Sequence, residues 1–93
     1  MKYQGMTAMI TGASSGLGEA FARQLATQGA NLVLVARSAE TLNSVAETLR
    51  GETRVEITVL SADLSSTAEV DRLIAEVRSR DLKIDLLGRV HAI

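Results

Sequence analysis

Three glycines lie close together near the start of the chain, in the segment Thr11-Gly12-Ala13-Ser14-Ser15-Gly16-Leu17-Gly18. An apolar run precedes this segment at 8–10, and apolar residues at helical spacing follow it. A strand joined to a helix through glycines makes a tight turn, because glycine adopts backbone conformations that other residues avoid. The start of the next helix attracts phosphate through its N–H groups. The segment therefore predicts a phosphate-binding turn, although three glycines also occur in ordinary loops.

Strands and helices alternate in the pattern of apolar residues along the rest of the chain. Short or branched apolar runs predict strands, and apolar stripes with a helical period predict helices. The expected strands are 8–10, 32–36, 55–60 and 84–87, and the expected helices are 16–29, 38–51 and 66–77. In the first helix the residues that recur at helical spacing are Leu17, Ala20, Phe21 and Leu25.

Sequence signals for helix ends support these boundaries. Ser38 is a candidate N-cap of the second helix, and Gly51 is expected to end that helix. Ser66 and Glu69 have the spacing of a capping box at the start of the third helix.

The order β-α-β-α-β-α-β predicts an α/β fold with a parallel sheet and helices on its faces. We expect the strand order 3-2-1-4, which is half of a Rossmann-like, doubly wound sheet, as a single partial domain over residues 1–93. Strand 55–60 is expected at one edge, because Glu56 and Thr58 alternate with its apolar residues. An unpaired edge at the fourth strand is expected to favour self-association.

Composition excludes several classes of function. Ten Lys plus Arg against eleven Asp plus Glu give a net charge of −1, which offers no basic field for nucleic acid. The chain has no cysteine and one histidine, His91, so disulfides and a thiolate or histidine metal cluster are excluded. No apolar run is long enough to span a bilayer, and a cytoplasmic protein is expected.

The spacing Gly-x-x-x-Gly-x-Gly after a strand and a threonine resembles the short-chain dehydrogenase/reductase family. The resemblance covers Met6 to Leu87 and is also carried by segments 31–37, 63–64 and 83–87. It implies a Rossmann-type fold, a nicotinamide dinucleotide cofactor, and hydride transfer to or from a carbonyl or an alcohol.

The resemblance also implies which residues bind the cofactor. Asp63 and Leu64 would border the adenine, with the carboxylate accepting a hydrogen bond from its amino group. Without the resemblance, Asp63 would more simply be a loop residue ahead of a helix. The residues expected around the phosphates are Gly12, Ser14, Ser15, Gly16, Leu17 and Gly18.

The end of the second strand indicates which dinucleotide is preferred. An acidic residue there would bind a ribose 2′-hydroxyl, whereas a basic residue would bind a 2′-phosphate. Ala36 occupies the acidic position and Arg37 follows it, so NADP is expected over NAD. Ser14 and Ser38 would complete that pocket. The alternative is that Arg37 is a solvated surface arginine.

Two further landmarks of the family are absent from the sequence. No Asn-Asn-Ala-Gly turn follows 84–87, and no Tyr-x-x-x-Lys segment exists, since Tyr3 is the only tyrosine and Thr7 stands four residues after it. No catalytic residue is therefore predicted, and isolated dehydrogenase activity is not expected. The sequence predicts the NADP-binding part of an oxidoreductase. The alternatives are a non-catalytic dinucleotide-binding or interaction module, or a truncated product without activity.

Overall fold

The computed structural model describes residues 2–12 and 16–89, which form seven elements. The strands are β1 (Thr7–Thr11), β2 (Asn31–Ala36), β3 (Ile57–Ser61) and β4 (Leu86–Arg89). The helices are α1 (Gly16–Thr27), α2 (Ala39–Glu52) and α3 (Thr67–Ser79). The predicted alternation of strands and helices is confirmed.

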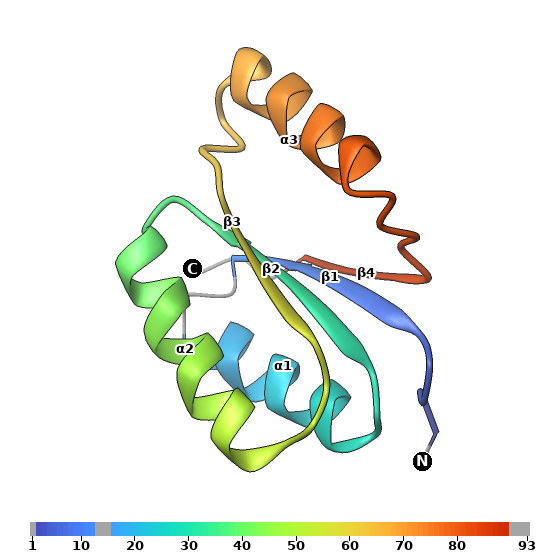
Figure 1. Cartoon of the computed structure of the whole chain (residues 1–93). Coiled ribbons are helices and arrows are strands. Elements are labelled where there is room, and N and C mark those ends of the chain that lie inside the picture. Colours follow the sequence, from blue (N-terminus) through green and yellow to red (C-terminus); the bar gives the residue numbers. More distant parts are fainter. Residues whose placement is uncertain (1, 13–15, 90–93) are drawn as a thin grey trace.

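The four strands form one parallel sheet in the order β3-β2-β1-β4, which is the predicted order. In the register, Met9 of β1 lies beside Val33 of β2 and Leu87 of β4, and β3 forms one edge as expected. Helices α1 and α2 cover one face of the sheet and α3 lies over the other (Figure 1). Because the strands are parallel, the carboxyl ends of β1, β2 and β3 all lie at the same end of the sheet.

Strand β2 is covered on both faces, as its unbroken apolar run predicts. Leu32 and Leu34 pack in the core under α1 and α2, which also contains Ile10, Leu42 and Leu49. The alternate residues of β2 pack on the opposite face, against α3. The members of this smaller cluster are Val33, Val35, Leu60, Ala62 and Leu73. The main core therefore lies between the sheet and α1 with α2.

The apolar stripe predicted for α1 is wrong at three of its four positions. Leu17 is 69% exposed and Phe21 is 42% exposed, and Ala20 is exposed as well. The helix instead turns its small residues to the sheet, and its buried positions are Gly18, Ala22, Leu25 and Ala26. Small residues let the helix axis approach the strands closely, which rotates the larger side chains toward the solvent.

Helix α2 does not end at Gly51. The helix continues to Glu52, and the N–H of Thr53 donates to the carbonyl oxygen of Leu49 at 2.8 Å. The Thr53 hydroxyl donates to the same oxygen at 2.8 Å, so the threonine provides two hydrogen bonds to a carbonyl group of the last turn. A glycine ends a helix when it adopts a left-handed conformation, and Gly51 is not among the residues with positive φ.

Strands β1 and β2 contain the predicted ranges with one residue added at one or both ends, whereas β3 and β4 are shifted toward the C-terminus. Strand β3 begins at Ile57 rather than at Val55, although Val55 packs against the main core. Strand β4 covers Leu86–Arg89 rather than 84–87. Ile84 packs instead in the cluster beneath α3. Apolar residues that approach the core before the ladder begins give the same sequence signal as strand residues.

Candidate functional site

The predicted site residues that the structure describes lie at the carboxyl ends of β1, β2 and β3. Gly12 follows β1, Arg37 follows β2, and Asp63 comes two residues after β3. Helix α1 begins at Gly16, so its positive end lies beyond the same end of β1. The fold therefore gathers residues far apart in the sequence, whereas Ser14 and Ser15 lie outside the described residues.

The glycines of the first turn have three different environments. Gly12 has a φ of +74°, a conformation that side-chain-bearing residues rarely adopt, and its N–H donates to the carbonyl oxygen of Val35 at 2.9 Å. Gly18 is buried against the sheet. Gly16 has an ordinary φ, and a Cβ added there would meet no atom within 4 Å. Gly12 therefore makes the turn and Gly18 allows close packing, but the fold gives Gly16 no such task.

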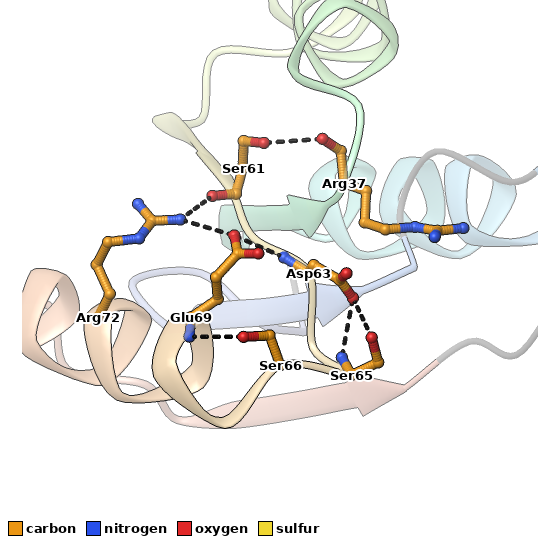
Figure 2. Close-up of polar contacts among 7 residues, drawn as sticks. All are labelled: Arg37, Ser61, Asp63, Ser65, Ser66, Glu69 and Arg72. Atoms are coloured by element: carbon orange, nitrogen blue, oxygen red, sulfur yellow. Dashed lines mark hydrogen bonds and ion pairs between the residues drawn. The ribbon is translucent and has the colours of Figure 1, made fainter.

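Arg37 and Ser38 connect β2 to α2. Arg37 is exposed, and Figure 2 shows its side chain extending on the side of the loop where Asp63 lies. Ser38 is the N-cap of α2, as predicted, and its hydroxyl accepts from the Thr41 N–H at 3.2 Å. The same hydroxyl donates to the Thr41 Oγ1 at 3.0 Å, so the structure gives Ser38 a capping task.

Asp63 is held in a tight local turn. Its Oδ1 accepts from the Ser65 hydroxyl at 2.6 Å and from the Ser65 N–H at 3.0 Å (Figure 2). These hydrogen bonds, together with the positive charge of Arg37, lower the pKa of the Asp63 carboxyl below its usual value. Asp63 is half-buried, and the neighbouring Leu64 is 41% exposed. The loop therefore presents an ionised carboxylate next to an exposed apolar side chain.

A network on α3, which sequence analysis missed, supports this loop. Glu69 was expected to complete a capping box, and the Ser66 hydroxyl does accept from the Glu69 N–H at 3.4 Å. The carboxylate of Glu69, however, accepts from the Asp63 N–H at 3.1 Å. Arg72 donates to Glu69 at 3.1 Å and to the Ser61 carbonyl at 3.0 Å (Figure 2). The spacing of Glu69 and Arg72 was the available signal, since residues three apart meet on one helix face.

An open hollow of about 620 Å³ lies at the other end of the sheet, near the amino ends of the strands. It lies between the C-terminal ends of α1 and α2, and its lining includes Thr27, Gly29, Asn31, Glu52 and Arg54. None of the predicted cofactor-binding residues that the structure describes lines it. The candidate site is therefore defined by converging loops, not by this hollow.

Other kinds of site receive no support in the described part of the chain. Residues 2–12 and 16–89 contain no group of three acidic, histidine or cysteine side chains suited to hold a metal ion. Within the same ranges, none of the helices is long and apolar enough to cross a membrane. His91 lies outside these ranges.

Comparison with known proteins reveals similar sequences and folds. The chain is 42% identical over 78 residues to 3-ketodihydrosphingosine reductase of Aspergillus fumigatus, covering 80% of this chain and 21% of that protein. It is 40% identical over 85 residues to the inactive hydroxysteroid dehydrogenase-like protein 1 of Rattus norvegicus, covering 90% of this chain and 26% of that protein.

A solved structure shares the fold over the whole chain. The L-sorbose reductase of Gluconobacter frateurii, complexed with NADPH and L-sorbose, superimposes with a TM-score of 0.89 at 34% identity, covering 100% of this chain and 36% of that one. The chain thus spans between about a fifth and just over a third of the length of these relatives. The sequence profile described as short chain dehydrogenase matches residues 6–91. The chain therefore belongs to the short chain dehydrogenase family.

Proposed function

We propose that this chain binds a nicotinamide dinucleotide, NADP in preference to NAD, as the nucleotide-binding part of a short-chain dehydrogenase/reductase. The parent reaction in this proposal is hydride transfer between the cofactor and a carbonyl or alcohol substrate. The cofactor supplies or accepts the hydride when bound, while the residues described above provide contacts for its phosphates and its adenosine end.

The observation that carries the proposal is the open space at Gly16. Its φ is ordinary and a Cβ would meet nothing, so the fold itself does not require glycine there. A missing side chain at the first residue of α1 lets a ligand approach the backbone at the positive end of the helix. A pyrophosphate matches this position by its negative charge.

Arg37 and Asp63 support the preference for NADP. A guanidinium is permanently charged and forms paired hydrogen bonds with phosphate, so exposed Arg37 fits a ribose 2′-phosphate. Asp63 remains ionised, and both of its contacts with Ser65 involve Oδ1. Its Oδ2 can then accept from the adenine amino group, with Leu64 against the ring. The remaining residues of this proposed site are Gly12, Ser14, Ser15, Leu17, Gly18 and Ser38.

Substitution of Gly16 tests the proposal directly. We expect Gly16→Ala and Gly16→Val to leave the ligand-free chain folded, because the space is open. Both variants should weaken NADP binding, Val more than Ala, because their side chains occupy the place of the phosphate. Thermal unfolding with and without NADP measures both effects, since a ligand present at about 100 times its dissociation constant adds about 2.7 kcal/mol. Unchanged NADP stabilisation in Gly16→Val would refute the phosphate site.

Substitution of Arg37 tests the choice of nucleotide. Wild-type protein should be stabilised more by NADP than by NAD, and Arg37→Ala should remove the difference while leaving NAD binding unchanged. Arg54→Ala is the matched control, because Arg54 is also exposed but lines the hollow at the other end of the sheet. Equal stabilisation of the wild type by both nucleotides would remove the role of Arg37.

A second candidate is a dinucleotide-binding module without catalysis. It is supported by the similarity to a rat protein named as inactive and by the absence of a Tyr-x-x-x-Lys segment from these 93 residues. We expect the chain alone to bind NADPH without oxidising it in the presence of carbonyl compounds. Saturable NADPH oxidation that Gly12→Asp abolishes would contradict this candidate.

We also propose that the 93-residue chain self-associates through β4. Among the described strands, β4 is the last in the sheet order, and an unpaired strand edge can bind other strands. Exposed Leu17 and Phe21 of α1 add apolar surface that favours association. Sedimentation velocity measures this, and a monomer at all concentrations tested would contradict it.

A further inference from the structure

Arg72 contacts the last residue of β3 from outside the sheet. Its Nη2 donates to the carbonyl oxygen of Ser61 at 3.0 Å. Because β3 is an edge strand, its outward-facing carbonyl groups have no neighbouring strand to pair with. Arg72 therefore fixes the end of β3 to α3.

Ser61 extends this contact to the loop that bears Arg37. Its hydroxyl donates to the carbonyl oxygen of Arg37 at 2.9 Å, and its backbone is paired with Ala36 in the ladder (Figure 2). The backbone at Arg37 is thus connected to Arg72 through a single residue.

Arg72 is also connected to Asp63, through the carboxylate of Glu69. The same Nη2 lies 3.1 Å from Oε1 of Glu69, and that oxygen accepts from the Asp63 N–H at 3.1 Å. In a capping box this carboxylate would bind the N-cap N–H, but the Ser66 N–H donates to the Asp63 carbonyl oxygen at 3.1 Å instead. Glu69 is therefore directed to the loop and not to its own helix end.

A simple surface ion pair would not have these contacts. Residues three apart on a helix commonly pair, and Arg72 and Glu69 have side chains 61% and 38% exposed. Such a pair stabilises only its own helix. Here both members also bind backbone groups outside α3, and those groups belong to Ser61 and Asp63.

We propose that Arg72 is a positioning residue for NADP recognition: through Ser61 and Glu69 it holds the loops of Arg37 and Asp63 in their relative places. The inference rests on the proposed function, since it assigns a supporting residue to that same site. Arg72 itself does not contact the nucleotide. Ser61 acts on the Arg37 side and Glu69 acts on the Asp63 side.

The test compares dissociation constants for NADP and NAD in variants of the full 93-residue chain. Ser61→Ala should weaken NADP more than NAD, because only NADP has the 2′-phosphate. Glu69→Ala should weaken both by the same factor. Arg72→Ala should weaken both and NADP more than NAD, raising the dissociation constant for NADP about tenfold, which corresponds to about 1.4 kcal/mol. Arg72→Lys, which keeps a donor, should recover part of the loss.

The control separates positioning from stability. Arg78→Ala removes another exposed arginine from the last turn of α3 and should leave both dissociation constants unchanged. A purely structural loss would weaken NADP and NAD binding by the same factor, so the ratio of the two dissociation constants reports on the positioning of Arg37, and the Asp63 side is tested by the exchange measurement below. Adding Ser61→Ala to Arg72→Ala should change this ratio less than Ser61→Ala does alone, because the two residues act in one chain of contacts. An unchanged ratio in Arg72→Ala would overturn the proposal.

A measurement without nucleotide distinguishes failure of this inference from failure of the proposed function. Amide hydrogen exchange at Asp63, followed by NMR, should be faster in Arg72→Ala and Glu69→Ala than in wild type and in Arg78→Ala. Unchanged exchange at Asp63 would overturn the positioning role whether or not the chain binds NADP. Failure of wild type to bind either nucleotide, with faster exchange in the variants, would overturn the proposed function and leave the contact network established.

Discussion

Asp63 shows how neighbouring groups fix the charge of a single residue. The largest influence on its carboxyl is the Ser65 hydroxyl at 2.6 Å, followed by the Ser65 N–H, with a smaller contribution from Arg37. All three favour the ionised form, so the pKa of Asp63 is lower in the folded chain than in the unfolded chain. The candidate site therefore keeps a negative charge beside Arg37 at neutral pH.

The low pKa of Asp63 predicts a dependence of stability on pH. A carboxyl with a lower pKa in the folded state stabilises the fold above its unfolded pKa of about 4, and this stabilisation is lost as the pH falls through the lower folded value. Ser65→Ala should raise the pKa of Asp63 toward its usual value and reduce the loss of stability in acid. Carbon-13 NMR of the Asp63 carboxyl during a pH titration measures the shift.

The comparison variant for this titration is Arg37→Ala. It should raise the pKa of Asp63 less than Ser65→Ala does, because Arg37 makes the smallest contribution among the groups that lower it. An Asp63 carboxyl that titrates identically in wild type and Ser65→Ala would contradict the assigned cause.

At the scale of elements, two glycines with similar places in the sequence have opposite roles. Gly29 follows α1 with a φ of +91°, and a Cβ there would lie 3.0 Å from Cα of Gln4. Gly51 lies inside the last turn of α2, and a Cβ there would meet no atom within 4 Å. Gly29 is therefore required by the turn into β2, while Gly51 only weakens a helix.

Alanine substitution at these two positions should change stability in opposite directions. Gly51→Ala should raise the free energy of unfolding by about 0.5–1 kcal/mol, the cost of glycine within a helix. Gly29→Ala should lower it by about 1–2 kcal/mol or more, since the left-handed conformation and the contact with Gln4 both resist a side chain. Urea unfolding at 25 °C measures both. Two changes of the same sign would contradict this assignment.

At the scale of the whole molecule, the two faces of the sheet are packed unequally. Helix α2 buries Leu42, Val45, Ala46 and Leu49, whereas Leu73 is the buried residue of α3. Ile74 of α3 is 45% exposed. The helix that holds the Arg72 network is thus the more loosely packed of the two, so its polar contacts matter more for its position.

Unequal packing predicts unequal local stability. Backbone amides of α3 should exchange with solvent faster than those of α2, because fewer buried apolar contacts resist local opening. Hydrogen–deuterium exchange followed by mass spectrometry compares peptides from the two helices. Leu42→Ala should accelerate exchange across the main core, while Leu73→Ala should act chiefly on α3. Equal protection of α2 and α3 would contradict this view of the fold.

Sequence patterns were sufficient for the architecture. The branched run in β2, the serine caps at Ser38 and Ser66, and the alternation of elements predicted the parallel sheet and its strand order. The patterns misled where two different local structures have the same sequence signal. Gly51 resembles a helix stop but continues α2, and Leu17 with Phe21 resembles a buried stripe but is exposed.

The amino-acid sequence determined the order of elements, the turn at Gly12 and the types of residue that follow each strand, because these depend on local backbone preference and hydrophobic period. Only the tertiary structure decided which side of α1 meets the sheet and where Glu69 and Arg72 direct their side chains. Those outcomes depend on contacts between separate segments of the chain, such as the hydrogen bonds of Arg72 to Ser61 and of Ser61 to Arg37. No local pattern encodes such contacts, since their energies arise only when the sheet brings the segments together.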